Sequence, residues 1–384
     1  MQLRRYRLAP DLVITFPEGQ PKLHLPSTHT TYKVDWKVCE VISMFSSEDP
    51  DTYTYKFSPS LSDSLIHSIV KKLIECNILI EKDKETEADS IVKKWEDWDE
   101  SSWFMHLQTK DAEFEPTEEG RLERVKMFRK ISTSPPPYYK CECSEERQIK
   151  LPAPSNLYEG SLSKAFLERR TCRRFSGEAI TLQDLADVLF YTGGILFTNA
   201  THSYGTVAKK ASPSPGARHS TELYPVVNNC EGLESGIYHY CQEHHALYLI
   251  TKDVDVKGFL SDALYDQDYF LDAAVTILYT SVVDRLKWKY KASRVYRLMH
   301  FETGHYAQNF VLTGSALNLG VFTTAAFKDS LVESVLGIDG IYETAMYVTG
   351  IGSKLPDREL RGDIEFSEFI PEDKKIGLPI GEHS

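Results

Sequence analysis

The sequence lacks the features that would place the protein in a membrane, in an oxidising compartment or on a polyanion. No apolar run approaches the roughly 18 residues that cross a bilayer, and the N-terminal stretch MQLRRYRLAPDLVITF has no apolar signal core. Cysteine is scarce, with 7 in 384 residues, and this odd count argues against a disulfide framework. Basic residues are outnumbered by acidic ones, 44 to 56, so the net charge of -12 disfavours a general nucleic-acid binder. These absences predict a cytoplasmic protein that engages neither membrane nor nucleic acid.

The cysteines also give no sign of a metal centre. Cys141 and Cys143 lie close together, but no second Cys or His pair follows them at zinc spacing. The sequence therefore predicts no metal.

The distribution of proline divides the chain into two parts. A chain of 384 residues with 41% hydrophobic composition has room for about two domains. Five prolines fall within residues 132–155, where periodicity is weak, as is typical of a linker or an extended strap: Pro135, Pro136, Pro137, Pro152 and Pro154. We therefore expect a first domain at 1–131, a linker at 132–155 and a second domain at 156–384.

The first part has the element order of a winged helix. Apolar residues recur at helical spacing over 34–45 and 61–76, and Asn77 then leads into a short apolar strand at 78–80, which we expect to be part of a strand hairpin. Many winged helices bind DNA, but residues 1–130 hold 19 Lys and Arg against 24 Asp and Glu. The prediction is a winged-helix-like domain that presents a groove or sheet edge to an extended peptide, with DNA binding as the alternative.

The stretch from Arg285 to Gly320 carries an unusual supply of reactive groups. Lys289 and Tyr290 stand side by side just before a long helix, and such side chains become proton acceptors only when a site perturbs them. Within the helix, Glu302, His305 and Asn309 fall at i, i+3 and i+7 and share one face. We interpret that face as a polar network or a subunit contact that holds a site, with a direct role for His305 as the alternative.

Three further clusters allow both a functional and a structural interpretation. RRTCRRF at 169–175, ahead of a helix that Thr181 caps, is either a phosphate grip or a solvated face. SPSPGAR at 212–218 lets backbone approach a flat ligand, or is a surface turn. Leu319-Gly320 predicts a glycine that ends the long helix, and VFTTAAF then supplies small residues.

Four of these strings, in this order and spacing, resemble one family. They are RRTCRRF at 169–175, SPSPGARHSTELY at 212–224, GIYHY at 236–240 and KYKASRVYRLMHFETGHYAQN at 289–309. The C-terminal 230 or so residues resemble the nitroreductase-like flavoproteins, and more narrowly the SagB-type dehydrogenases, FMN-dependent azoline oxidases of ribosomal peptide maturation. The resemblance implies an α+β fold with a central, mostly antiparallel sheet flanked by helices, the cofactor FMN and a homodimer.

The resemblance also implies roles for individual residues. Lys289 and Tyr290 match the catalytic lysine-tyrosine pair of the family. The residues matched to FMN binding are Arg169, Arg170, Thr171 and Arg173 at the phosphate, Ser212, Pro213, Ser214 and Gly216 along the flavin ring, and Thr324 and Ala325 near its N5 edge. Two departures, Lys291 after the pair and Pro215 in the loop, leave room for a related redox reaction on a peptide.

The function so implied is oxidation of azoline rings to thiazole or oxazole in a ribosomally made precursor peptide. A cyclodehydratase is a further partner that this chemistry would call for. Removing one ring hydrogen as a proton and another as a hydride to the flavin needs a base, either a tyrosinate or a neutral lysine. The alternatives are a flavin-dependent reductase of dehydroalanine peptides or of small nitro or quinone compounds, and a precursor-peptide-binding or DNA-binding protein with a degenerate flavin domain.

Overall fold

The protein forms two compact units, Met1–Phe114 and Glu115–Ser384, in the computed structural model. The residues that it describes are 6–45, 61–95, 100–110, 122–123, 126, 134–140, 148–155, 162–201, 205–267 and 271–355. No helix among these residues is long and apolar enough to span a bilayer. Cys141 and Cys143 lie outside the described residues.

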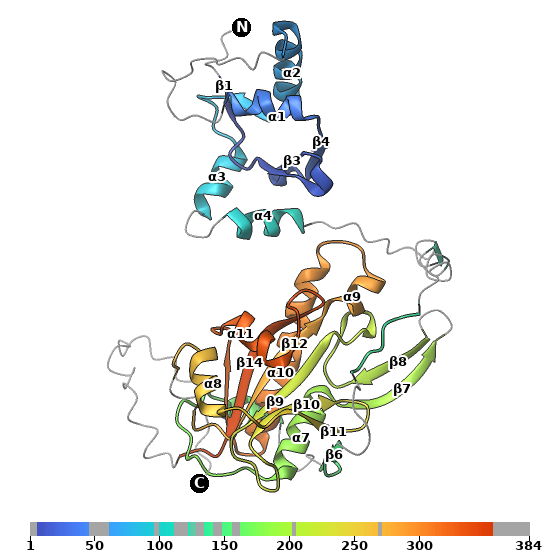
Figure 1. The fold of residues 1–384 in the computed structure, drawn as a ribbon, viewed down its shortest axis with the longest axis vertical. Coiled ribbons are helices and arrows are strands. Elements are labelled where there is room, and N and C mark those ends of the chain that lie inside the picture. The colour runs from blue at the N-terminus through green and yellow to red at the C-terminus, as the bar shows by residue number, and fades with distance from the viewer. Residues whose placement is uncertain are drawn as a thin grey trace. The chain divides into compact units, whose positions relative to one another are not determined.

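Within the described residues, the first unit combines two small sheets with four α-helices (Figure 1). Its elements are β1 (Tyr6–Leu8), β2 (Val13–Thr15), β3 (Lys22–Leu25), β4 (Thr30–Lys33), α1 (Trp36–Ser43), α2 (Asp63–Glu75), β5 (Leu79–Glu81), α3 (Glu87–Lys94) and α4 (Glu100–Gln108). Strands β2, β3 and β4 form an antiparallel sheet in that order, and β5 pairs with β1.

Helices and a strand occur where the sequence predicts them, but the wing hairpin does not. The side chains of Asp35 and Ser62 accept hydrogen bonds from the first turns of α1 and α2, so both helices begin at polar caps. Strand β5 pairs with the N-terminal β1, and helix α3 is the next described element. The expected hairpin is wrong for the described residues because the partner of β5 comes from about 70 residues earlier, a pairing with no local signal.

The second unit is built on a seven-stranded sheet in the order β13-β14-β12-β9-β10-β11-β6 (Figure 1). Every strand pair in it is antiparallel, as predicted for the central sheet. The strands are β6 (Gln148–Lys150), β9 (Thr221–Val227), β10 (Gly236–Cys241), β11 (Ala246–Thr251), β12 (Val275–Val282), β13 (Gly320–Thr324) and β14 (Glu343–Gly352). A separate hairpin pairs β7 (Ile195–Thr201) with β8 (Gly205–Lys210).

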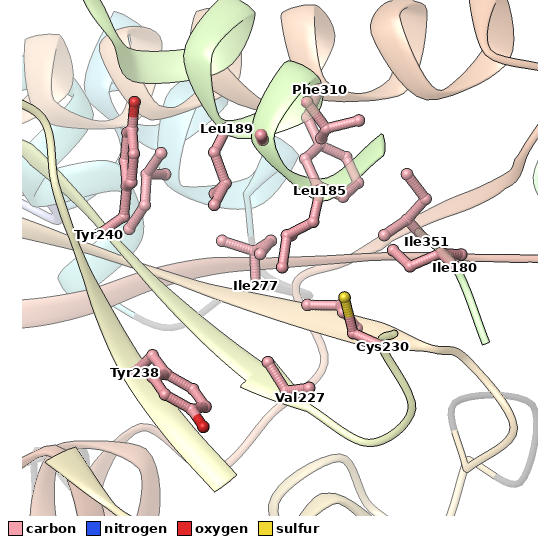
Figure 2. Close-up of a cluster of buried hydrophobic side chains, with 14 of the residues drawn as sticks. Ile180, Leu185, Leu189, Val227, Cys230, Tyr238, Tyr240, Ile277, Phe310 and Ile351 are labelled. Atoms are coloured by element: carbon pink, nitrogen blue, oxygen red, sulfur yellow. The ribbon is translucent and has the colours of Figure 1, made fainter. Parts of the chain in front are cut away.

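Helices cover both faces of this sheet. They are α6 (Leu162–Glu168), α7 (Leu182–Gly193), α8 (Val256–Ala263), α9 (Val283–Lys289), α10 (Val295–Ala316) and α11 (Asp329–Leu336). Neighbouring strand residues point to opposite faces, so Ile277 packs with α7 and α10 while Leu278 packs with α8 and α11. Figure 2 shows the first of these cores, where Leu185 and Leu189 of α7 meet Ile277. Helix α10 therefore packs directly on the buried strands of the sheet.

Part of the segment expected as a linker belongs to the second unit. Strand β6 pairs with β11 at the edge of the seven-stranded sheet. Lys140, from the same segment, donates hydrogen bonds to the phenol of Tyr224 at 3.0 Å and to the carboxylate of Glu343 at 2.5 Å. The described part of the segment therefore packs on the second unit, and the division between the two compact units falls between residues 114 and 115.

Candidate functional site

Helix α10 holds the loop between β8 and β9 by one face. Asn309 donates a hydrogen bond from Nδ2 to Oγ of Ser212 at 2.8 Å, and His305 donates from Nδ1 to the carbonyl oxygen of Pro213 at 3.3 Å. Ser214 donates from Oγ to Oε2 of Glu302 at 2.6 Å. Three successive loop residues are thus matched by three residues on one helix face, and the polar network that the i, i+3, i+7 spacing predicts is present.

The carboxylate of Glu302 is the centre of this network. It is fully buried, and its Oε1 accepts from Oγ of Ser220 at 3.0 Å and from the backbone N–H of Thr221 at 2.9 Å. A buried carboxylate is stable only when donors surround it. Glu302 therefore ties the loop and the start of β9 to the helix.

Lys289 and Tyr290 meet this loop at Gly216. A β-carbon on Gly216 would lie 2.5 Å from the phenol oxygen of Tyr290 and 2.6 Å from Nζ of Lys289. Nζ of Lys289 also donates to the carbonyl oxygen of Gly216 at 3.3 Å. Gly216 has a φ of 62°, in the left-handed region that favours glycine. The lack of a side chain here makes room for the ends of both residues.

The two residues converge because the backbone changes conformation between them. Lys289 is the last residue of α9, and Tyr290 is extended, with φ -122° and ψ 131°. In a regular helix or strand the side chains of adjacent residues point in different directions. The sequence alone therefore suggests that the side chains of Lys289 and Tyr290 diverge. The end of the helix removes that constraint, and both side chains reach Gly216.

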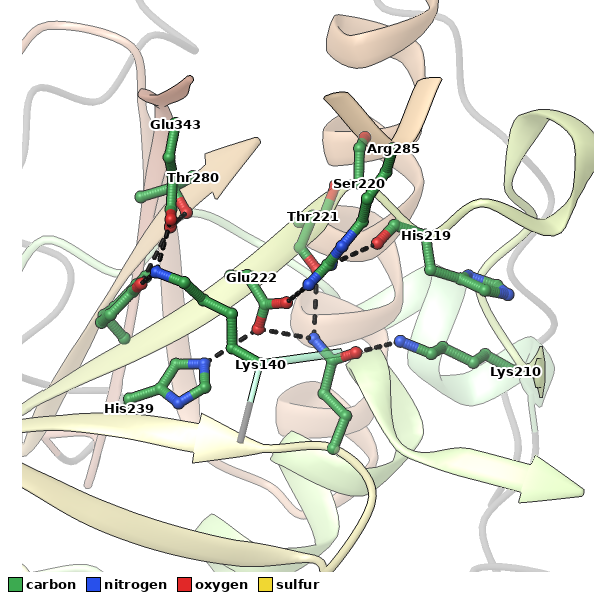
Figure 3. A network of polar contacts seen from close by, with 12 residues as sticks. Lys140, Lys210, His219, Ser220, Thr221, Glu222, His239, Thr280, Arg285 and Glu343 are labelled. Carbon is green, nitrogen blue, oxygen red and sulfur yellow. Dashed lines mark hydrogen bonds and ion pairs between the residues drawn. The ribbon is translucent and has the colours of Figure 1, made fainter. Parts of the chain in front are cut away.

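A buried ion-pair network lies behind the loop (Figure 3). Arg285 donates from Nη1 to the carbonyl oxygen of His219 at 2.7 Å, and its Nη2 lies 2.6 Å from Oε1 of Glu222. The other oxygen of Glu222 lies 2.9 Å from Nε2 of His239. Lys210, the last residue of β8, donates to the amide oxygen of Gln242. None of these residues is among those predicted from the sequence, although a glutamate inside the otherwise apolar and hydroxylic strand TELYPVV is a usable signal.

Burial and charge shift the ionisation of this network. Burial alone would raise the pKa of the Glu222 carboxyl, but Arg285 and His239 lower it to about 2. Burial lowers the pKa of Lys210 to about 7. Burial, with Lys210 nearby, lowers the pKa of His219 to about 3, so this imidazole is neutral at pH 7.

The arginine segment lines a cavity of about 290 Å³ at the start of β13. Cys172 donates its backbone N–H to the carbonyl oxygen of Val321 at 2.8 Å, which fixes the segment against β13. The lining residues are Glu168, Arg170, Thr171, Cys172, Arg173, Arg174, Ser315, Leu319, Gly320 and Lys354. Arg169 is outside that set, whereas the other three predicted phosphate-binding residues are in it.

Gly320 has a different role from the one its place in the sequence suggests. Helix α10 ends at Ala316, and Asn318 takes the left-handed conformation with φ 58°, so the prediction of a helix-ending glycine at 320 is wrong. A β-carbon on Gly320 would lie 2.8 Å from Sγ of Cys172. Glycine is needed there because the arginine segment packs directly on β13.

A second cavity of about 360 Å³ lies at the other end of β13. Its lining residues are His300, Thr303, Gly304, Ala307, Gln308, Thr323, Ala325, Met346 and Tyr347. Ala325 is among them, but the side chain of Thr324 instead accepts the backbone N–H of Ala326 at 3.0 Å. Gly320 and Thr323 stand three residues apart, about 10 Å in a strand, so the two cavities are neighbours along β13 and α10.

The second unit is similar in sequence to known proteins. Residues 167–353 match the sequence profile of the Nitroreductase family. A protein of Methanocaldococcus jannaschii named as a nitroreductase is 29% identical over 208 residues, which cover 54% of this chain and 97% of that protein. The trifolitoxin-processing protein TfxB of Rhizobium leguminosarum bv. trifolii is 32% identical over 174 residues, or 44% of this chain. The chain spans less than half, 46%, of TfxB.

Among solved structures, a nitroreductase of Anabaena variabilis has a similar chain. It is 26% identical with a TM-score of 0.48, and the match covers 64% of this chain and 49% of that one.

The residues present fit the cofactor of this family. FMN carries a phosphate and a flat ring, and the cationic cavity offers guanidinium groups from Arg170 and Arg173 and a hydroxyl from Thr171. Lys354 also lines this cavity. The neighbouring cavity is bordered by small residues such as Gly304 and Ala325. FMN is the cofactor of this domain.

Proposed function

We propose that the protein is a flavin oxidoreductase that oxidises azoline rings to thiazole or oxazole in a ribosomally made precursor peptide, a proposal that starts from the match of residues 167–353 to the Nitroreductase family. The observation that carries the proposal is the convergence of Lys289 and Tyr290 on Gly216. Azoline oxidation needs a base beside the hydride acceptor, and this pair supplies one next to the loop proposed to lie along the flavin.

Each part of the site has a distinct task in this proposal. FMN, when bound, would supply the hydride acceptor. Ser212, Pro213, Ser214 and Gly216 line its ring, and α10 fixes their positions through Glu302, His305 and Asn309. Arg170, Thr171 and Arg173 would bind its phosphate in the cavity at the start of β13, and Ala325 would lie near the ring edge. Lys289 and Tyr290 hold the azoline and take its proton.

The name of one relative supports a peptide as substrate. TfxB is named for the processing of trifolitoxin, and its matched part is 32% identical to this chain. A small-molecule substrate would not require a unit such as Met1–Phe114 ahead of the flavin domain. A homodimer and a cyclodehydratase partner complete the proposal.

We assign peptide binding to the first unit, which would act as a winged-helix-like peptide-binding domain. Strand β4 is an edge of its sheet within the described residues, and an edge strand can pair with an extended peptide. An apolar groove of about 240 Å³ adjoins it, lined by Leu23, Tyr32, Lys33, Val34, Val38, Ile69, Lys72, Leu73, Cys76 and Ile78. Val38→Asp would place a charge in the groove, so it should weaken peptide binding while FMN content stays unchanged.

The test is turnover of an azoline-containing peptide followed by mass spectrometry. Wild-type protein purified with FMN should remove two hydrogens per ring. Lys289→Ala and Tyr290→Phe should keep the flavin spectrum and lose about 10²-fold or more in rate, the usual range for a missing general base. Lys287→Ala, an exposed change on the same helix, is the matched control and should keep full activity. A colourless protein, or full activity in both pair variants, would refute the proposal.

A reductase of dehydroalanine peptides or of small nitro or quinone compounds is the second candidate, favoured by the name of the matched family. It differs in its electron source. Rapid bleaching of the bound flavin by NAD(P)H, with no mass loss from an azoline peptide, would identify the reductase.

A further inference from the structure

The free edge of β4 in the first unit presents backbone groups that can bond to a partner. Strand β4 pairs with β3 on one side, and no other strand of the described residues pairs with it. Just after β4, Val34 donates its backbone N–H to the carbonyl oxygen of Pro21 at 3.1 Å. Bonded and non-bonded pairs alternate along an antiparallel ladder, so Tyr32 bonds to β3, whereas Thr31 and Lys33 direct their N–H and C=O groups to the free edge.

The two faces of β4 differ in character. Tyr32 lies opposite Leu23 of β3, and both line the apolar groove described above. Neighbouring strand residues point to opposite faces, so the side chains of Thr31 and Lys33 lie on the other face. Residues directly opposite each other in a sheet share a face. A strand added to β4 would therefore present its side chains alternately to the groove and to the face of Lys33.

The face of Lys33 carries two like charges side by side. Lys22 is the residue directly opposite Lys33 in the register of β3 and β4. Like charges in that position destabilise a sheet. Neither lysine forms an ion pair within the described part of the first unit, and the nearby carboxylate of Asp35 caps α1 by accepting the backbone N–H of Lys37 at 2.8 Å. This pair of cations favours a carboxylate on the strand beside it.

The groove on the opposite face suits aliphatic side chains. Its volume is about 240 Å³, and its walls come from β3, β4, α1 and α2, with the apolar side chains of Leu23, Tyr32, Val38, Ile69 and Leu73 among them. Lys72 of α2 is an exposed member of the lining, and it forms no ion pair among the described residues. The groove thus combines an apolar interior with a cation.

The charge of the first part of the chain favours a short acidic segment over a nucleic acid. Residues 1–130 hold 19 Lys and Arg against 24 Asp and Glu. The lysines at β4 and α2 are therefore a local exception on an acidic unit. A nucleic acid carries a continuous row of phosphates that this unit would repel, whereas a peptide can place one or two carboxylates at the lysines alone.

We propose that β4 binds, as an added strand, a segment of the precursor peptide in which aliphatic residues alternate with aspartate or glutamate. The proposal rests on the assignment of peptide binding to the first unit and names the side chains that the peptide must carry. The aliphatic side chains fill the groove, and a carboxylate opposite Lys33 binds Lys33 and Lys22. Lys72 adds to the attraction from the groove side. Backbone bonds to Thr31 and Lys33 set the register.

The test measures binding of labelled peptides to the full-length protein by fluorescence anisotropy at about 0.15 M salt, where distant charges are screened. The probe has two leucines and two aspartates in alternation between Gly-Ser flanks, and matched peptides carry asparagine or lysine in place of aspartate. The aspartate peptide should bind most tightly. Lys33→Glu should weaken its binding about 5-fold or more, because an attraction becomes a repulsion, and should strengthen binding of the lysine peptide. Lys82→Glu makes the same charge change at an exposed site outside the groove and is the control.

Hydrogen exchange separates strand addition from attraction by charge alone. With the aspartate peptide bound, the amide hydrogens of Thr31 and Lys33 should exchange at least about 10-fold more slowly. The amide of Tyr32 already bonds to β3 and should change little. Unchanged exchange at Thr31 and Lys33 would overturn the proposed strand addition.

Three other results would overturn the proposal. They are equal binding of the three peptides, equal losses in Lys33→Glu and Lys82→Glu, and tighter binding of a short DNA duplex than of the aspartate peptide. A self-association that Lys33→Glu abolishes without peptide would assign the edge to a second copy and overturn it too. No measurement here uses an azoline or flavin turnover, so this proposal and the proposed reaction can fail separately.

Discussion

Ser214 donates a 2.6 Å hydrogen bond to Glu302, a residue 88 positions later in the chain. The same carboxylate accepts from Ser220 and from the backbone of Thr221. One buried glutamate on a helix therefore determines the position of both ends of the proposed flavin loop. The consequence can be measured in stability and in cofactor binding.

Glu302→Gln should destabilise the protein by about 3 kcal/mol, because the amide would place donors against donors in a buried site. Urea unfolding would give this free energy, and FMN retention during gel filtration should fall with it. Asp253→Asn, on an exposed turn, is the control and should stay within about 0.5 kcal/mol of the wild type. Equal losses in the two variants would show that the network does not support the loop.

Gly216→Ala should displace Lys289 and Tyr290, since the added carbon would lie 2.6 Å from Nζ of Lys289 and 2.5 Å from the phenol oxygen of Tyr290. Misplacement of reacting groups by about 1 Å can cost about 10²-fold in rate, so turnover should fall by that order while FMN stays bound. Single-turnover kinetics would measure it.

Gly232→Ala separates this clash from backbone strain. Gly232 has a φ of 74°, like Gly216, but a β-carbon there would meet nothing within 4 Å. It should lose about 1 kcal/mol of stability and keep its rate. A comparable fall in turnover in this variant would contradict the explanation given for Gly216.

Arg173→Ala should weaken FMN binding by about 10-fold to 100-fold, the effect of losing one or two charge-assisted hydrogen bonds to a phosphate. Fluorescence titration of the apoprotein with FMN would give the ratio, and riboflavin, which has no phosphate, should bind both proteins alike. Lys164→Ala removes an exposed charge from the adjacent α6 and serves as control. An unchanged affinity for FMN in Arg173→Ala would contradict the assignment of the phosphate to this cavity.

Stability should fall as the pH drops from about 4.5 to about 2. The pKa of Glu222 is held at about 2 in the folded protein, below its ordinary value of 4.5, so its ion pair with Arg285 stabilises the fold above that range and is lost as the pH falls through the folded value. Thermal melting at several pH values would show it. Glu222→Gln should melt at a lower temperature near neutral pH and show a shallower dependence below pH 4.5.

Structural features that depend on neighbouring residues, such as helix caps, can be predicted from the sequence. Thr181 caps α7 in a capping box with Asp184, as its position before an amphipathic stretch indicates. The mostly antiparallel sheet, the loop at Ser212 and the arginine segment follow from motifs in register. Pairings between distant segments leave no such signal: the partnership of β5 with β1, the edge position of β6 and the ion pair of Glu222 with Arg285 are all set by the folded chain.

Lys210 lies between the β7–β8 hairpin, which we expect to be the more mobile part, and the loop from Ser212 onward, which we expect to be more rigid. The β7–β8 hairpin forms its own two-stranded sheet, and isolated ribbons of this kind are marginally stable. Its second strand runs straight into the flavin loop, but the bond from Lys210 to Gln242 joins its last residue to the main sheet. Amide hydrogens of β8 should therefore exchange quickly at Thr206 and slowly from Ser212 onward. The end of the hairpin farthest from Lys210 should therefore open to solvent more often than the loop proposed to line the flavin.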